Sequence, residues 1–286
     1  MQKSFAYLLE REGKKTFDRL AGLKNILWAI GIVLCLVLLF VGFVFSAVTP
    51  YHGDTDPRTP NLNAIKEEKG TVDVDSLTFV EPDGELHELR ETTDAGEDYI
   101  RSAVFLTDSI MIAMRDQSLT GGDVWSSESG SLPIGNIATW NILYSDGSKI
   151  SPVDACLVTK PSVLFLCIGS DGLARVDKAT FISGYEALIR AILVASPETT
   201  LVCCSIPPVG ENYSSLDDLT SDLANEGSEW IREACREVGV YFVDVAQAVR
   251  SGVDLNPKYA AANGKSLNAA GIQAVLGYLR THAIDN

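Results

Sequence analysis

Three short polar segments combine residue types that could carry out a hydrolytic reaction. They are Thr107-Asp108-Ser109, Gly169-Ser170-Asp171 and Asn263-Gly264-Lys265-Ser266. Ser109 follows an apolar run, at a point where a strand gives way to the next element, so its hydroxyl could reach a substrate. A serine hydroxyl is hardly ionised at neutral pH, and it needs a base before it can act as a nucleophile.

No histidine lies in any of these three segments. The chain contains only His52, His87 and His282. His52 falls in a polar stretch and His87 lies close to charged residues, so both are expected to be solvated. His282 ends the predicted last helix, about 20 Å from its start by helical rise. We therefore expect none of the three to serve Ser109.

Strand-like and helical patterns alternate after residue 102. Short apolar runs cover residues 103–106, 163–168, 200–206 and 240–245, and helical stretches cover residues 179–195, 216–238 and 269–282. This alternation predicts an α/β fold with a parallel sheet covered by helices on both faces. Ligands of such sheets bind at the carboxyl ends of the strands, where Ser109 and Asp171 are both expected.

The three segments and their surroundings resemble the SGNH/GDSL hydrolases over about residues 97–281. In that family a Gly-Asp-Ser block carries the nucleophile, a later glycine and a Gly-x-Asn block supply oxyanion donors, and an Asp-x-x-His block supplies the base. The resemblance implies a flavodoxin-like α/β fold. Further stretches similar to the family are residues 160–166, 205–209, 241–245 and 267–271.

The resemblance assigns a role to each candidate site residue. Ser109 takes the nucleophile position, although a turn serine that caps the next helix is an alternative. Asp108 supports its loop by hydrogen bonding. The oxyanion positions fall to Gly135 and Asp171, and the positions of the orienting aspartate and the base histidine fall to Asn263 and Ser266.

Three of these positions depart from the family pattern. An ionised Asp171 offers no donor to an oxyanion, and the loss of one donor costs roughly 10²–10³ in turnover; its alternative role is a helix N-cap. Asn263 and Ser266 cannot accept a proton as imidazole does. The sequence therefore predicts a degenerate catalytic triad.

A site with a degenerate triad could still bind a ligand. Its hydroxyl, amide and carboxylate groups suit sugar hydroxyls, and Trp125 and Trp140 could pack on a sugar ring, although both tryptophans could instead be packing residues. The expected ligand is a cell-envelope carbohydrate or an acyl ester. No phosphate-binding glycine loop or zinc-ligand spacing is present, so we expect neither a cofactor nor a metal.

Residues 26–48 predict a transmembrane helix. These 23 positions carry no charge, and at 1.5 Å per residue they span the hydrocarbon core of about 30 Å. Six basic residues precede the span, which predicts a cytoplasmic N-terminus and an extracytoplasmic domain. A cleaved signal peptide is the alternative, but its apolar region is usually shorter, about 7–15 residues.

The net charge of the chain makes one class of partner, nucleic acid, unexpected. The net charge of −15 becomes −18 beyond residue 26, so the domain should repel nucleic acid.

Five cysteines follow the span, mostly in apolar runs, and buried free thiols are the expected state.

The predicted organisation has five parts. They are a cytoplasmic segment (residues 1–25), a transmembrane helix (26–48), a linker (49–70), an extracytoplasmic β-hairpin extension (71–96) and an SGNH-hydrolase-like domain (97–286). The leading hypothesis is a catalytically impaired protein that binds envelope glycans or acts as an accessory protein. A residual serine esterase that deacylates a surface carbohydrate is the alternative, and a purely structural role is a third.

Overall fold

A parallel sheet of six strands forms the centre of the domain. The computed structural model describes residues 84–211, 213 and 219–284, and its sheet has the strand order β1-β8-β7-β6-β2-β3. The strands are β1 (His87–Glu88), β2 (Val104–Thr107), β3 (Val124–Trp125), β6 (Val163–Cys167), β7 (Thr200–Cys204) and β8 (Tyr241–Val243). The predicted α/β fold with a parallel sheet is confirmed.

The middle of the sheet consists of the apolar runs that predicted it. Every residue of β2 is buried, and four of the five residues of β6 and of β7 are buried. Phe105 of β2 pairs in register with Phe165 of β6, and their rings stack 5.0 Å apart. Strands that are buried on both faces need continuous rather than alternating apolar sequence, which is what these runs supply.

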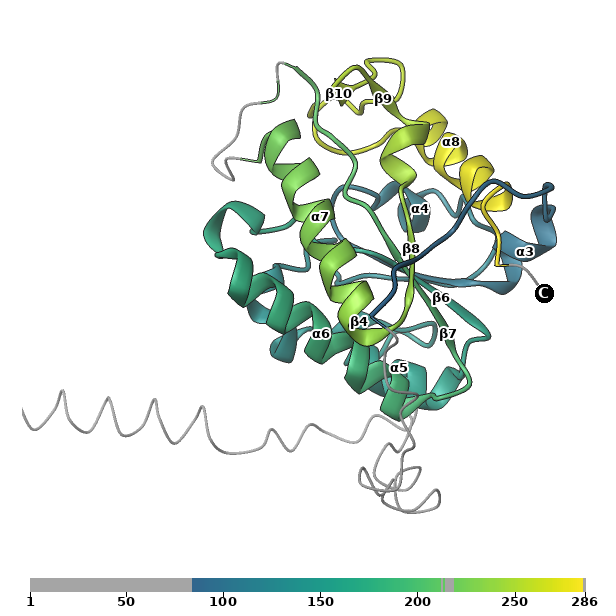
Figure 1. Ribbon diagram of the computed structural model, residues 1–286. Coiled ribbons are helices and arrows are strands. Elements are labelled where there is room, and N and C mark those ends of the chain that lie inside the picture. The colour runs from purple at the N-terminus through teal and green to yellow at the C-terminus, as the bar shows by residue number, and fades with distance from the viewer. Residues whose placement is uncertain (1–83, 212, 214–218, 285–286) are drawn as a thin grey trace, which may run out of the picture. The chain divides into compact units, whose positions relative to one another are not determined.

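Helices cover both faces of the sheet. Helices α5 (Pro152–Thr159), α6 (Lys178–Ala195) and α7 (Ser221–Val238) pack together on one side, and α3 (Glu97–Ser102), α4 (Ala113–Asp116) and α8 (Ala269–Arg280) lie on the other (Figure 1). The three long helices α6, α7 and α8 begin at capping side chains, because Asp177, Thr220 and Asn268 each accept a backbone N–H of the first turn.

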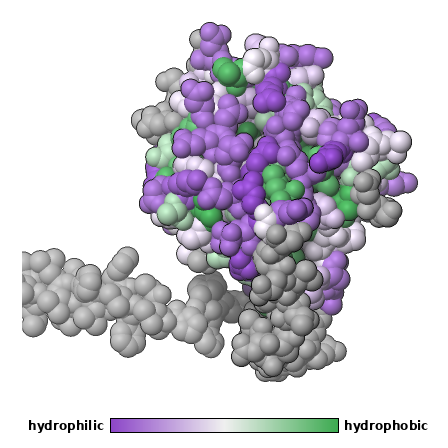
Figure 2. Space-filling model, viewed as in Figure 1, coloured by the Kyte–Doolittle hydropathy of each residue, from purple (hydrophilic) through white to green (hydrophobic). Residues whose placement is uncertain are grey.

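Shorter elements complete the described part of the chain. Two small antiparallel ladders pair β4 (Ile142–Leu143) with β5 (Lys149–Ile150) and β9 (Arg250–Ser251) with β10 (Asp254–Leu255). The 3-10 helices are η2 (Ile134–Thr139), η3 (Leu173–Arg175) and η4 (Val245–Ala248). Figure 2 shows one face of the molecule, on which hydrophilic residues predominate.

The segment before α3 differs from the predicted hairpin strand. His87 and Glu88 pair in parallel with Tyr241 and Phe242 of β8 and form the edge of the main sheet. The other strand of the expected hairpin lies outside the described residues. Because β1 contains only two residues, its pattern could not distinguish a hairpin strand from an added sheet edge.

The predicted membrane span, residues 26–48, also lies outside the described residues. Among the helices that are described, none is long and apolar enough to cross a bilayer. The five cysteines of the domain are all buried and carry no disulfide: Cys156, Cys167, Cys203, Cys204 and Cys235.

Candidate functional site

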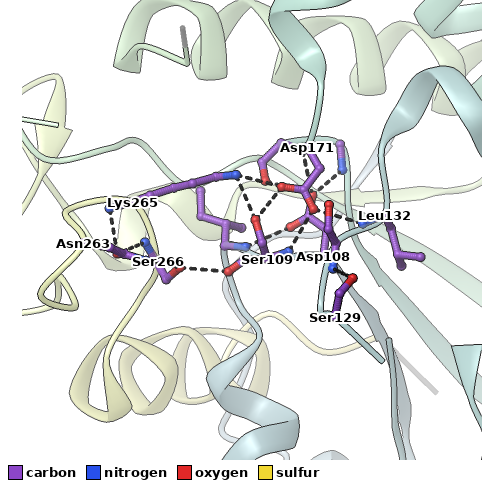
Figure 3. A network of polar contacts seen from close by, with 12 residues as sticks. Asp108, Ser109, Ser129, Leu132, Asp171, Asn263, Lys265 and Ser266 are labelled. Atoms are coloured by element: carbon purple, nitrogen blue, oxygen red, sulfur yellow. Dashed lines mark hydrogen bonds and ion pairs between the residues drawn. The ribbon is translucent and has the colours of Figure 1, made fainter. Parts of the chain in front are cut away.

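Ser109 lies just beyond the carboxyl end of β2, beside the loops that follow β6 and precede α8 (Figure 3). Its hydroxyl donates a hydrogen bond to Asp171 Oδ1 and accepts one from Lys265 Nζ at 2.8 Å. The alternative capping role is not seen, since the N-cap of α4 is Ile112 and no side chain caps that helix. The Ser109 hydroxyl therefore both donates and accepts a hydrogen bond within the site.

Lys265 and Asp171 form a buried ion pair next to this hydroxyl. Lys265 Nζ lies 2.7 Å from Asp171 Oδ1, and the two side chains are only 8% and 6% exposed. Figure 3 shows the lysine side chain reaching across from the third segment to the other two residues. Its amine thus lies where a base for Ser109 would have to be.

The electrostatics hold both members of the pair in their charged forms. Burial would lower the pKa of Lys265, but the charge of Asp171 and the hydrogen bond to it outweigh burial and raise that pKa. Burial would likewise raise the pKa of Asp171, but the Lys265 ammonium and the hydrogen bonds from Lys265 and Ser109 lower it. An ammonium has no lone pair, so Lys265 in this state cannot accept the proton of Ser109.

The Asp171 carboxylate also occupies two backbone donors. Its Oδ2 accepts the N–H of Ser109 at 3.3 Å and the N–H of Leu132 at 3.0 Å. Backbone N–H groups next to a nucleophile are the donors that usually stabilise an oxyanion. Here they already bind a negative oxygen that belongs to the protein. The alternative helix-capping role of Asp171 is not seen, because Gly172 is the N-cap of η3.

Asp108 joins the first segment to the second. Its Oδ2 accepts the backbone N–H groups of Gly169 and Ser170 at 3.0 and 2.8 Å and the Ser170 hydroxyl at 2.9 Å. Burial and the charge of Asp171 raise the pKa of Asp108 to about 6, against the opposing effects of Lys265 and of the donors. Gly169 turns there with a φ of 125°, a left-handed conformation that favours glycine.

Asn263 and Ser266 brace the third segment rather than act on the Ser109 hydroxyl. Asn263 Oδ1 accepts the N–H groups of Lys265 and Ser266 at 3.0 and 2.9 Å, and its Nδ2 donates to Ser266 Oγ at 3.0 Å. Ser266 Oγ in turn donates to the backbone carbonyl of Ser109 at 2.9 Å. An amide and a hydroxyl thus interact where the family pattern has a carboxylate and an imidazole.

Gly135 lies away from this cluster of contacts. It belongs to η2 and lines a separate, mostly apolar groove of about 550 Å³ with residues of α5 and α6. In the part of the chain that the structure describes, the loop donor to the site is the Leu132 N–H instead. The Gly135 backbone has no described contact with Ser109 or Asp171.

The prediction that Trp125 and Trp140 bind a sugar is wrong. Both indoles belong to the buried core, with 2% and 5% of their surfaces exposed. Trp125 lies in β3, and Trp140 Nε1 donates to the carbonyl of Pro133 at 3.0 Å. A buried ring face cannot pack against a ligand, so the alternative packing role describes both residues.

The two histidines within the described residues, His87 and His282, contact other aromatic rings and not Ser109. His52 lies outside the described residues. His87 packs against Tyr241, with ring centroids 6.0 Å apart, and His282 stacks on Tyr278 at 3.7 Å. The group that sequence reasoning missed is the Lys265 amine, although the third segment contains it. Its reach to Ser109 depends on how the loop turns, which spacing alone does not reveal.

Part of the sequence matches a known protein family. Residues 147–274 match the model of the GDSL-like Lipase/Acylhydrolase family. This part of the domain therefore carries the sequence pattern of that family. The matched region contains the Asp171 and Lys265 segments, and Ser109 precedes it. Comparison with curated proteins found no match.

Several solved structures are similar to this SGNH/GDSL-like domain. A candidate platelet activating factor from Streptococcus pneumonia is 19% identical, with a TM-score of 0.47 over 63% of this chain and 82% of the other. A candidate SGNH hydrolase from Slackia heliotrinireducens is 20% identical, with a TM-score of 0.45 over 63% and 98%. A GDSL-like lipase from Bacteroides thetaiotaomicron is 12% identical, with a TM-score of 0.44 over 65% and 89%.

Proposed function

We propose that this chain is a membrane-anchored, extracytoplasmic member of the SGNH/GDSL group that has lost efficient hydrolysis and binds a cell-envelope glycan or acts as an accessory protein. The observation that carries the loss of hydrolysis is the Lys265–Asp171 pair on the Ser109 hydroxyl. The anchor and its orientation are supported by the uncharged residues 26–48 and the basic residues before them.

The pair opposes hydrolysis in two separate ways. An attacking oxygen needs a lone pair directed at the carbonyl and a group that accepts its proton. The Lys265 ammonium donates to that oxygen, and Asp171, whose pKa is lowered, is a weak proton acceptor. The same carboxylate occupies the donors of Ser109 and Leu132, so a developing oxyanion would meet negative charge instead of N–H groups.

The second candidate function is residual serine esterase activity on an acylated surface carbohydrate. One distance favours it, the 2.8 Å between Lys265 Nζ and Ser109 Oγ. A serine with a neutral lysine as base is a known catalytic arrangement. Because Asp171 raises the pKa of Lys265, this route would operate only in strongly alkaline solution.

Turnover of short acyl esters distinguishes the two candidates. The full-length protein in detergent should hydrolyse p-nitrophenyl acetate at neutral pH no faster than its Ser109→Ala variant. Asp98→Asn, a change at an exposed helix position with a side chain 97% accessible, serves as a matched control for handling. Ser109-dependent turnover at neutral pH, well above that of the variant, would overturn the proposed loss of hydrolysis and favour the esterase.

A further inference from the structure

A second hollow is lined in part by the third segment, which also contributes to the Ser109 cluster. Its volume is about 610 Å³, within the range of about 300–1,000 Å³ for small-molecule sites. Asn263 and Gly264 line this hollow, whereas Lys265 and Ser266, next in the chain, contact Ser109. The hollow and the Ser109 cluster therefore share one loop.

Backbone hydrogen bonds fix the walls of this hollow. Gly210 donates to the carbonyl of Gly264 at 2.8 Å, and the Tyr213 N–H donates to the carbonyl of Gly210 at 2.8 Å. Leu255 donates to the carbonyl of Val209 at 3.0 Å. The loops after β7 and before α8 are thus joined to each other, and the first is joined to β10. These bonds preform the arrangement of the lining.

The lining combines an aromatic ring with oxygen-rich side chains. Tyr213 supplies the ring, Glu211 and Asp254 supply carboxylates, and Asn263 and Ser251 supply an amide and a hydroxyl. Asp254 is held in place by the Ser221 hydroxyl, which donates to its Oδ1 at 2.7 Å. A few directional polar groups beside an apolar surface are typical of sites that orient a small ligand.

The charge of the lining excludes one class of ligand. Among the described residues that line the hollow, two are acidic and none is Lys or Arg. A carboxylated or phosphorylated ligand would meet like charge there, without a cation to offset it. Leu255 and the run of alanines at residues 260–262 add apolar surface, and this surface suits the C–H groups of a sugar ring.

We infer that this hollow is a binding site for a non-anionic pyranose, with the Tyr213 ring against the C–H face of the sugar and the Glu211 and Asp254 carboxylates accepting its hydroxyl groups. The inference rests on the proposed glycan-binding function and names its site. It replaces the buried tryptophans with Tyr213 as the aromatic surface for the sugar. It also separates recognition of the ligand from the Ser109 cluster.

Titration calorimetry on the full-length protein in detergent tests this site. The probes are a tetramer of N-acetylglucosamine, its deacetylated amino form and a tetramer of galacturonate. The first two should bind, and the anionic galacturonate should not. Tyr213→Ala and Asp254→Asn should each weaken binding by roughly tenfold or more. Tyr213→Phe, which keeps the ring, and Asp98→Asn, at an exposed distant position, should bind like the native chain.

The outcomes separate this inference from the proposed function. Sugar binding that Asp171→Ala or Ser109→Ala weakens, but Tyr213→Ala and Asp254→Asn leave unchanged, would place the site in the Ser109 cluster and overturn the inference alone. Tighter binding of the galacturonate than of the neutral tetramer would also overturn it. If no probe binds to a folded protein, both the inference and the glycan-binding function fail. Melting temperatures within a few degrees of the native value establish that each variant is folded.

Discussion

One carboxylate determines the chemistry of the Ser109 cluster. An asparagine side chain at position 171 would donate to an oxyanion, whereas the Asp171 carboxylate accepts hydrogen bonds from Ser109, Leu132 and Lys265. Its charge also keeps Lys265 protonated. A single difference between an amide and a carboxylate therefore replaces a donor with an acceptor and favours the protonated form of a nearby amine.

Asp171→Asn should convert the cluster into a weak serine esterase with Lys265 as its base. The change removes the largest of the effects that raise the pKa of Lys265, so burial will lower that pKa and a neutral amine will form at a lower pH. It also restores an amide donor. We expect kcat/KM for p-nitrophenyl acetate to rise by roughly 10²-fold. The pH–rate profile should increase with pH and reach its midpoint below the pKa of Lys265 in the native chain.

Two double variants control this experiment. Asp171→Asn combined with Ser109→Ala removes the nucleophile, and Asp171→Asn combined with Lys265→Met removes the amine but keeps an apolar side chain of similar length. Both should lose the gain in rate. Activity that persists without Lys265 would show that the amine is not the base.

Restoring the catalytic triad of the family requires three substitutions in the site and, in addition, the removal of the Lys265 side chain. Ser266→His, Asn263→Asp and Asp171→Asn together supply an imidazole, its orienting carboxylate and an oxyanion donor. Lys265 nevertheless lies 2.8 Å from Ser109 Oγ, where the imidazole must bind. We expect the triple variant to hydrolyse short esters faster than the native chain, and added Lys265→Ala to raise kcat again. Equal rates for the triple and quadruple variants would contradict this steric argument.

At the scale of elements, Asp108 joins the loops that follow β2 and β6. Strands β2 and β6 are paired in register up to Thr107 and Cys167. Beyond their ends, Asp108 accepts three backbone N–H groups and a hydroxyl from the second segment. The position of Asp171 beside Ser109 therefore depends on the buried side chain of Asp108.

Asp108→Ala should destabilise the domain by roughly 2–5 kcal/mol, because it leaves buried donors without an acceptor. The pKa of Asp108 is raised to about 6, above its value of about 3.9 in an unfolded chain. The folded state therefore binds more protons between about pH 4 and 6, and the contribution of this group declines as the pH rises through that window. Urea unfolding should show that Asp108→Ala lowers the free energy of unfolding more at pH 4.5 than at pH 7.5. A larger decrease at pH 7.5 would contradict the predicted direction of the pH dependence.

Sequence patterns predicted the long elements of the fold well. The apolar runs matched β2, β6, β7 and β8 to within three residues at each end, because strands buried on both faces need such runs. The edge strands β1 and β3 contain two residues each, which is too short for periodicity to register. Because β3 was not predicted, the burial of Trp125 within this strand was not predicted either.

The candidate site was predictable only in part. Ser109 and Asp171 could be assigned to one sheet edge because both follow adjacent parallel strands. The role of Lys265 could not be assigned, since it depends on a turn held by Asn263 that directs one side chain across the site. Side-chain direction in a loop does not follow from residue spacing.

At the scale of the whole molecule, charge is distributed very unevenly along the chain. Residues 1–26 have a balance of +3, while the rest of the chain has −18. Basic residues within about 15–20 positions of a span determine its orientation, and acidic residues contribute little. The orientation of the predicted span should therefore depend on the first 25 residues and be independent of the acidic domain.

Replacing the four basic residues nearest the span with glutamine should disturb this orientation. In the native chain, protease added outside intact cells should digest the chain beyond about residue 50 and spare the N-terminal segment, because that segment is expected in the cytoplasm. The four substitutions should leave a sizeable fraction of chains protected: Lys14→Gln, Lys15→Gln, Arg19→Gln and Lys24→Gln. The matched control changes four lysines of the domain to glutamine and should digest like the native chain: Lys149, Lys160, Lys178 and Lys258. Protection of the domain in the native chain, with cells shown to be intact, would reject the proposed topology.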